Sequence, residues 1–178
     1  RLFLAAGRLL FRGGVAPGIF IKPEKCTGCR LCELTCTFNK FDDFNPEDAS
    51  IRILSLDEQG LQVPMTCIQC DEPDCVDACP VEALTKDEET GVVKLNQDLC
   101  IECEACVEAC PYGSITYSTR HNRIIKCDQC DGEPQCVKIC PGGALEFKEL
   151  DGELKDKREK VASQYSTTFK KVYREVAK

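Results

Sequence analysis

Four compact cysteine runs are the part of this 178-residue chain best equipped to do chemistry. All sixteen cysteines fall in these runs, four to each. They are Cys26, Cys29, Cys32 and Cys36; Cys67, Cys70, Cys75 and Cys79; Cys100, Cys103, Cys106 and Cys110; and Cys127, Cys130, Cys136 and Cys140. Four thiolates at such spacing are the ligand set of one [4Fe–4S] cluster. The sequence therefore predicts four [4Fe–4S] clusters, whose iron is bound by all sixteen cysteines.

The spacing inside the runs suits a cubane. Three cysteines at C-x2-C-x2-C let one loop curl around a cluster and aim backbone N–H groups at its sulfurs. Runs two to four end in Cys-Pro, as in bacterial ferredoxins, whereas Thr37 follows Cys36 in the first run. Runs two and four widen the gap before the third cysteine and place Pro73 and Pro134 there.

Structural zinc and disulfides are the two alternatives for so many cysteines. Zinc sites show separated C-x2-C pairs or mixed Cys and His ligands, but this chain has one histidine. A disulfide framework belongs to secreted proteins, and no signal peptide is visible. The pattern favours clusters over both.

Composition limits the remaining functions. The net charge of −7 disfavours nucleic acid and favours basic partner surfaces. No apolar run is long enough to span a bilayer, so we expect a cytoplasmic protein without a transmembrane span. Small ferredoxin modules bury little apolar surface, so the clusters must serve as the core and contribute to folding.

The elements that position the cysteines are short strands and turns. We expect a strand at 19–21, another at 50–54, and a turn at 57–60 leading through 61–65 into the second run. After each Cys-Pro we expect a hairpin, which repeats as a ferredoxin half-module. The three predicted hairpins pair 83–85 with 92–95, 114–119 with 123–126, and 144–148 with residues near 154.

Both ends of the chain have an amphipathic pattern. We assign 1–18 to an N-terminal extension with a helix over 1–12, and 151–178 to a basic C-terminal helix. Residues 155–178 hold eight basic and three acidic side chains, a net +5, which leaves about −12 for the other 154. The C-terminal helix can pack on its own chain, clamp a catalytic subunit, or contact another copy to give a ring or filament.

Catalytic residues are not evident. His121 lies in a polar turn, so we expect a solvated loop histidine. We find no nucleotide-binding glycine fingerprint, flavin site or nucleophile arrangement. The sequence therefore predicts a protein that is not catalytic alone.

With all four runs in view, the chain resembles the four-cluster iron–sulfur electron-transfer subunits of molybdenum and tungsten oxidoreductases. These include the small subunits of dimethyl-sulfoxide reductase, formate dehydrogenase and formate hydrogenlyase. The first run, with the stretches at 44–46 and 50–53, is similar to the iron–sulfur subunits of bacterial tungsten aldehyde oxidoreductases and benzoyl-CoA reductases, and of carbon-monoxide dehydrogenase systems. The resemblance covers about residues 19–148.

The resemblance implies an α+β fold of two nested ferredoxin-like modules. Runs one and four would form the outer module, 19–55 and 120–150, and runs two and three the inner module, 56–119. Spacing alone also allows run one to pair with two, and three with four. The implied ligand sets, in spatial order, are Cys26, Cys29, Cys32 and Cys140; Cys127, Cys130, Cys136 and Cys36; Cys67, Cys70, Cys75 and Cys110; and Cys100, Cys103, Cys106 and Cys79.

The resemblance also implies a function. The chain would be an electron wire between a tungsten or molybdenum catalytic subunit and a second redox partner, which is a flavin or NAD-linked subunit, a hydrogenase or a ferredoxin. The alternative is a free polyferredoxin that shuttles electrons by diffusion.

Overall fold

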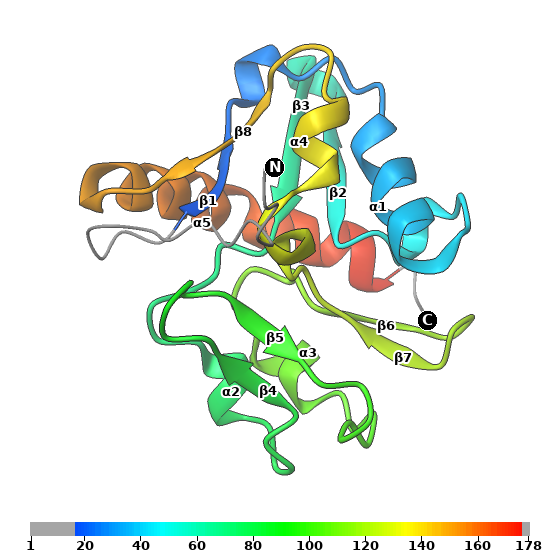
Figure 1. Cartoon of the computed structure of the whole chain (residues 1–178). Helices are drawn as coiled ribbons and strands as arrows, with labels where there is room; N and C mark the ends of the chain where they lie inside the picture. The colour runs from blue at the N-terminus through cyan, green and yellow to red at the C-terminus, as the bar shows by residue number, and fades with distance from the viewer. Residues whose placement is uncertain (1–16, 176–178) are drawn as a thin grey trace, which may run out of the picture.

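The computed structural model describes residues 17–175. Within this range, short two-stranded antiparallel sheets and α-helices surround the cysteine runs, as Figure 1 shows. The mixed helix and small-sheet class expected from the sequence is therefore confirmed. The helix predicted over 1–12 lies outside the described residues.

Three of the sheets are local hairpins. Two of them confirm the pairings predicted after the Cys-Pro pairs of the second and third runs, and the third joins the strands on either side of the predicted turn at 57–60. The strand pairs are β2 (Ile51–Leu56) with β3 (Leu61–Thr66), β4 (Leu84–Lys86) with β5 (Val93–Leu95), and β6 (Thr116–Ser118) with β7 (Arg123–Ile125).

The predicted hairpin from 144–148 to residue 154 is wrong. β8 (Leu145–Glu149) instead pairs with β1 (Pro17–Ile21) from the other end of the described chain. The chain after β8 begins a helix because the Asp151 carboxylate accepts a hydrogen bond from the Leu154 N–H at 2.9 Å. Such a capping carboxylate satisfies a donor that a helix start leaves free.

All four helices within the runs start one residue before the third cysteine. They are α1 (Leu31–Phe41), α2 (Asp74–Asp77), α3 (Ala105–Ala109) and α4 (Gln135–Ile139). The last three helices end before the cysteine of the Cys-Pro pair that follows them. They end there because proline disfavours helical geometry in the residue before it. Cys110 and Cys140 are accordingly extended, with ψ of 114° and 106°.

Buried residues form two main apolar cores. One joins β1, β2 and β8 to cysteines of the first and fourth runs, with Ile19, Ile53 and Leu145 almost fully buried. The other joins the hairpins β4–β5 and β6–β7 to cysteines of the second and third runs. In Figure 1 these cores occupy the upper and lower halves of the molecule.

Helix α5 (Gly152–Glu175) crosses the middle of the molecule in Figure 1, above the half that contains α2, α3, β4 and β5. Its Phe169 is 3% exposed and packs in a third cluster with Leu54, Val63 and Met65 of the β2–β3 hairpin. The Tyr173 hydroxyl donates to the Ile53 carbonyl at 2.5 Å. The helix therefore packs on its own chain, which is one of the three alternatives for it, and this packing buries part of the apolar face that motivated a filament.

His121 is not the solvated histidine that we expected. Its ring stacks on Phe41 with centroids 4.3 Å apart. Its Nε2 lies 3.5 Å from the Asp48 carboxylate, and the side chain is only 23% exposed. The turn is polar in sequence, but α1 extends far enough to cover it.

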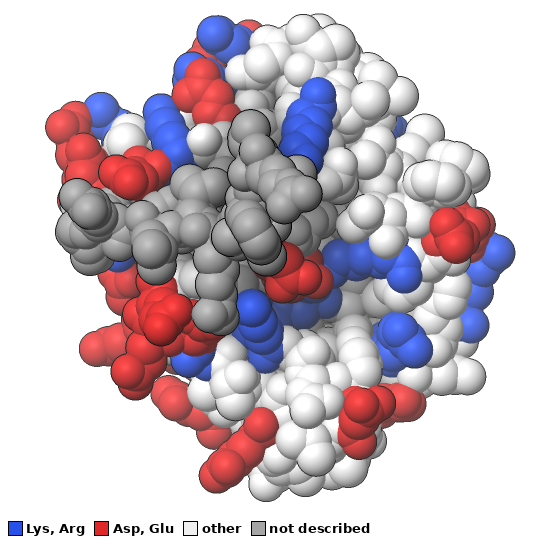
Figure 2. Space-filling view, in the orientation of Figure 1, with Lys and Arg blue, Asp and Glu red and all other residues white. Residues whose placement is uncertain are grey.

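The helices within residues 17–175 are too short or too polar to cross a membrane. Figure 2 shows acidic side chains along the lower rim of the molecule, in the region of α2 and β4, with basic side chains scattered across the middle of the same face.

Candidate iron–sulfur sites

The first site joins the beginning and end of the described chain. Cys26, Cys29, Cys32 and Cys140 line one small cavity. Cys32 sits in the first turn of α1, and Cys140 ends α4. Burial raises the pKa of the Cys26 thiol, and negative charge on Cys140 and Cys29 adds to the effect. Bound iron would offset this effect, because a cysteine ligand binds a metal as its thiolate.

The second site also joins the first and fourth runs. Cys36, Cys127, Cys130 and Cys136 line its cavity. Cys36 projects from the interior of α1, while the other three come from the segment between β7 and the end of α4. Burial raises the pKa of the Cys136 thiol, and the charges of the other three raise it further.

The third site draws on the second and third runs. Cys67, Cys70, Cys75 and Cys110 line its cavity. Cys67 directly follows β3, and Cys110 directly follows α3. Burial raises the pKa of the Cys70 thiol to about 12, with the other three thiols adding to the shift.

The fourth site contains Cys79, Cys100, Cys103 and Cys106. Burial raises the pKa of the Cys106 thiol to about 11, and the charges of the other three cysteines contribute. Cys79 differs: burial alone would raise its pKa, but hydrogen bonds from the N–H groups that follow Pro80 lower it overall.

Charge effects between single cysteines connect neighbouring sites in a series. Besides burial, the charge of Cys32 raises the pKa of Cys136, which couples the first site to the second. Burial and the charge of Cys67 likewise raise the pKa of Cys127 to about 11, which couples the second site to the third. The charge of Cys106 also contributes to the raised pKa of Cys75, which couples the third site to the fourth.

A left-handed residue precedes the second cysteine of every run. The four are Gly28, Gln69, Glu102 and Gln129, with φ between 51° and 70°. This conformation reverses the chain direction over one residue, so the loop curls around the thiols. Only Gly28 signals it in sequence, because glycine adopts positive φ without strain. The three non-glycine positions were missed.

Backbone N–H groups also point at the sulfurs. Ala83 donates to the Cys79 sulfur at 3.2 Å and Ser114 to the Cys110 sulfur at 3.3 Å, in each case four residues after the cysteine. Ser50 donates to the Cys36 sulfur at 3.3 Å. Such hydrogen bonds stabilise negative charge on cluster ligands and influence cluster potentials.

The donor sets fit iron–sulfur clusters. All sixteen cysteines are free thiols. Within residues 17–175, no three His, Cys, Asp or Glu side chains are close enough to hold a single metal ion. That spacing is compatible with a cubane, because each of its four thiolates binds a different iron.

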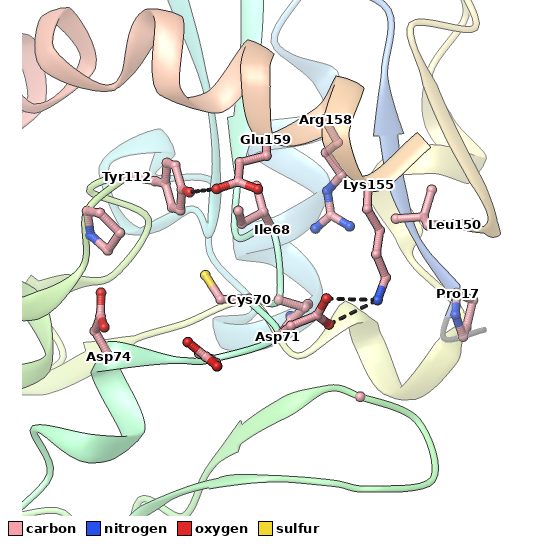
Figure 3. Close-up of a pocket in the computed structure, with 14 residues that line it drawn as sticks. Pro17, Ile68, Cys70, Asp71, Asp74, Tyr112, Leu150, Lys155, Arg158 and Glu159 are labelled. Atoms are coloured by element: carbon pink, nitrogen blue, oxygen red, sulfur yellow. Dashed lines mark hydrogen bonds and ion pairs between the residues drawn. The ribbon is translucent and has the colours of Figure 1, made fainter. Parts of the chain in front are cut away.

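An open pocket of about 420 Å³ lies between α5 and the loop of the second run, beside the third site. Figure 3 shows Lys155 reaching from α5 to Asp71, whose two carboxylate oxygens lie 2.9 and 3.1 Å from its ammonium. On the same wall, the Tyr112 hydroxyl donates to Glu159 at 3.0 Å. These contacts attach α5 to the loops of the second and third runs.

Comparison with known families gives two matches. Residues 59–150 match the 4Fe-4S dicluster domain, and residues 23–39 match a 4Fe-4S binding domain. The first match covers the second, third and fourth cysteine runs, and the other covers the first.

Comparison with individual proteins points the same way. The polyferredoxin-like subunit of Pyrococcus furiosus aliphatic sulfonate oxidoreductase is 46% identical over 122 residues, 68% of this chain and 70% of that protein. The B subunit of Escherichia coli K12 anaerobic dimethyl sulfoxide reductase is 34% identical over 166 residues, 82% of this chain and 79% of that protein. A solved active-site complex of benzoyl-coenzyme A reductase aligns over 92% of this chain and 98% of its own, with 25% identity and a TM-score of 0.45. The resemblance to oxidoreductase iron–sulfur subunits is confirmed by the two sequence relatives.

Proposed function

Since the chain belongs to the 4Fe-4S dicluster domain family, we propose that it carries four [4Fe–4S] clusters and conducts electrons within a larger oxidoreductase complex. When bound, the clusters supply one-electron transfer. The protein holds them, sets their potentials and excludes water. The chain is non-catalytic alone in this proposal.

The observation that carries the proposal is the grouping of the cysteines, in which each site draws on two runs. Its ligand sets are those implied by the family resemblance: three cysteines from one run and the last cysteine of its partner run. Support comes from the cavities at the first three sites and from the mutual charge effects among all four. Charge effects between single cysteines also connect the first site to the second, the second to the third, and the third to the fourth.

We further propose that the two ferredoxin-like modules are nested. The pairing of β1 with β8 supports this, because it closes the segment containing runs two and three between the ends of the other module. The β2–β3 hairpin, which ends at Thr66, spans the boundary set at 55/56. We therefore place the boundary after Thr66 instead.

The two ends of the series are the proposed points of electron entry and exit. Cys29 at the first site and Cys103 at the fourth are exposed. Leu31, two residues after Cys29, is 39% exposed. Leu99 and Ile101, which precede Cys103 in the third run, are 53% and 60% exposed. Apolar side chains around an exposed ligand suit a surface that a partner covers.

The proposed partners are of two kinds. A tungsten or molybdenum catalytic subunit would occupy one end, and a flavin or NAD-linked subunit, a hydrogenase or a ferredoxin the other. The relatives support a complex, since their names describe subunits of oxidoreductases. A reducing cytoplasmic location suits sixteen free thiols.

The function is tested with the native complex purified without oxygen. We expect about 16 iron atoms per chain, four for each cubane. A complex lacking this chain should keep its catalytic metal but lose electron delivery from the physiological partner, while an artificial dye still supports turnover at the catalytic subunit. Full physiological turnover without the chain would refute the proposal.

The ligand sets are tested with Cys36→Ser. In our assignment it alters the second cluster, whose other ligands come from the fourth run, and leaves the first cluster intact. Cys32→Ser, one helical turn away, should alter the first cluster instead. Electron paramagnetic resonance distinguishes the two if their spectra change differently; identical changes would argue that the first run holds one cluster by itself.

A free polyferredoxin remains the second candidate. We expected the apolar face of the C-terminal helix to count against it, but that face packs on its own chain. The discriminating measurement is the mass of the native particle: a stable 19.8 kDa species would favour the free carrier.

A further inference from the structure

Two buried cations flank Cys67, a proposed ligand of the third cluster. The Lys126 ammonium lies 3.4 Å from the Cys67 sulfur, and the Arg158 guanidinium donates to the Cys67 carbonyl at 3.0 Å. Lys126 is 5% exposed and Arg158 is 6% exposed. The cysteine pattern gives no indication of either residue.

The surroundings of Lys126 are those of a charged donor. Its ammonium contacts three acceptors: the Cys67 sulfur at 3.4 Å, the Gln69 side-chain oxygen at 3.3 Å and the Cys127 carbonyl at 3.1 Å. A lysine ammonium has three protons and no acceptor capacity, so the set matches its charged form. The Gln69 oxygen is held in place because it also accepts from the Val93 N–H at 3.0 Å.

Arg158 reaches Cys67 because α5 is held close to the loops of the second run. The pairing of Lys155 with Asp71 fixes the helical turn that precedes Arg158. Figure 3 shows the side chains of Lys155 and Arg158 extending from the same part of α5. Gly18 in β1 leaves room for the guanidinium, since a Cβ there would lie 2.5 Å from Arg158 Nη1. Strand, helix and loop thus combine to bury this cation.

We propose that Lys126 and Arg158 raise the reduction potential of the third cluster, the one assigned to Cys67, Cys70, Cys75 and Cys110. This inference rests on the proposed ligand sets. Reduction adds negative charge to a cluster, so a nearby cation stabilises the reduced state. Burial makes the effect stronger because salt and water screen buried charges weakly. The hydrogen bond from the Lys126 ammonium to the Cys67 sulfur also stabilises the reduced state and so raises the reduction potential.

The test is a redox titration of the anoxically purified complex, followed by electron paramagnetic resonance. Lys126→Met should shift the midpoint of one cluster to a more negative potential while about 16 iron atoms per chain remain. Lys126→Arg, which keeps the charge, should shift it less. The matched control is Lys157→Met, which removes the same charge from an exposed position paired with Glu153.

Arg158→Met should shift the same signal in the same direction, and Arg158→Lys should restore part of the shift. A role limited to packing predicts lower thermal stability with an unchanged midpoint. Fully loaded Lys126→Met and Arg158→Met complexes with wild-type midpoints would overturn the inference. Low iron in the wild type would instead refute the proposed function.

A measurement on the wild type covers variants that do not assemble. Protein labelled with 15N at the lysine side chain should give a nitrogen coupling to one reduced cluster in pulsed electron paramagnetic resonance, because the Lys126 nitrogen lies next to a ligand sulfur. Absence of that coupling at every cluster would overturn the role of Lys126.

Discussion

Single buried residues connect the cysteine runs to the strands behind them. Glu33, next to Cys32, is 1% exposed, and its carboxylate accepts a hydrogen bond from the Ile53 N–H at 2.6 Å. Burial raises the pKa of this carboxyl, and the Ile53 N–H opposes the rise. Ile53 lies opposite Pro64, and both of its backbone polar groups are satisfied by side chains, Glu33 and Tyr173.

Glu33→Ala should destabilise the holo-protein by about 1–3 kcal/mol, because the buried Ile53 N–H loses its acceptor. The temperature at which the cluster absorbance is half lost should therefore fall by several degrees. Glu33→Gln keeps an acceptor oxygen and serves as the control. Equal melting temperatures for the Ala variant and the wild type would contradict this role.

At the scale of elements, the departure from Cys-Pro in the first run has a structural reason. Cys36 lies in the middle of α1, which continues to Phe41, whereas the helices of the other runs are one turn long. Thr37 is fully buried, and its hydroxyl donates to the Leu34 carbonyl at 3.0 Å. A proline at position 37 would break the helix. The part of α1 that follows would then be displaced, including Lys40, whose ammonium donates to the Lys126 carbonyl at 2.8 Å.

Thr37→Pro should therefore cost about 3 kcal/mol or more, although it restores the Cys-Pro pattern. We expect faster bleaching of the second cluster, whose proposed ligand Cys36 directly precedes the substitution. Thr37→Val, which removes the hydroxyl and keeps the helix, should have a much smaller effect. Wild-type bleaching kinetics in the proline variant would show that α1 does not need to continue past the cysteine.

Phe169 is a buried aromatic anchor of helix α5. Phe169→Ala should destabilise the protein by about 3–5 kcal/mol, since it empties a buried site against the β2–β3 hairpin. Val172→Ala, on the same helix but 42% exposed, is the matched control and should change little. The rate at which a protease cleaves α5 measures the destabilisation in each of the two variants. Equal sensitivity of the two variants would argue against the observed packing.

At the scale of the whole molecule, cysteines make up much of the interior. Cys32, Cys36 and Cys136 belong to one apolar core, and Cys106 and Cys110 to the other. Loss of the clusters would leave these buried thiols without the iron that connects them across each site. Metal binding and folding are therefore coupled.

Chelation of iron should unfold both cores together, and circular dichroism should follow the loss of visible absorbance. Anoxic addition of iron and sulfide should restore both signals, which controls for irreversible damage. An iron-free protein that keeps native hydrogen-exchange protection in β1 and β8 would contradict the coupling.

The exposed end at the fourth site should be a contact surface. Ile101→Glu should slow reduction by the partner at that end about tenfold or more, the equivalent of about 1.4 kcal/mol of lost contact energy. Stopped-flow reduction of the complex gives the rate. Val172→Glu, on α5, should leave it unchanged; equal rates for Ile101→Glu and the wild type would place the contact elsewhere.

The sequence by itself determined the chemistry and the local elements. Sixteen cysteines in four runs specify the cluster type, because the thiolate pattern is local in the chain. The hairpins β4–β5 and β6–β7 were also predictable, since turn residues and short apolar strands lie close together. The start of α5 carried a signal as well, Asp151, which we did not use.

Only the tertiary structure decided how distant segments meet. Ile19 pairs with Phe147, and Arg158 reaches Cys67, across separations that no local pattern encodes. Such contacts form when they bury enough surface to offset the entropy of closing long loops. The same holds for Lys126, whose surroundings come from three parts of the chain. Local spacing therefore predicts the ligands, and packing decides which charges surround them.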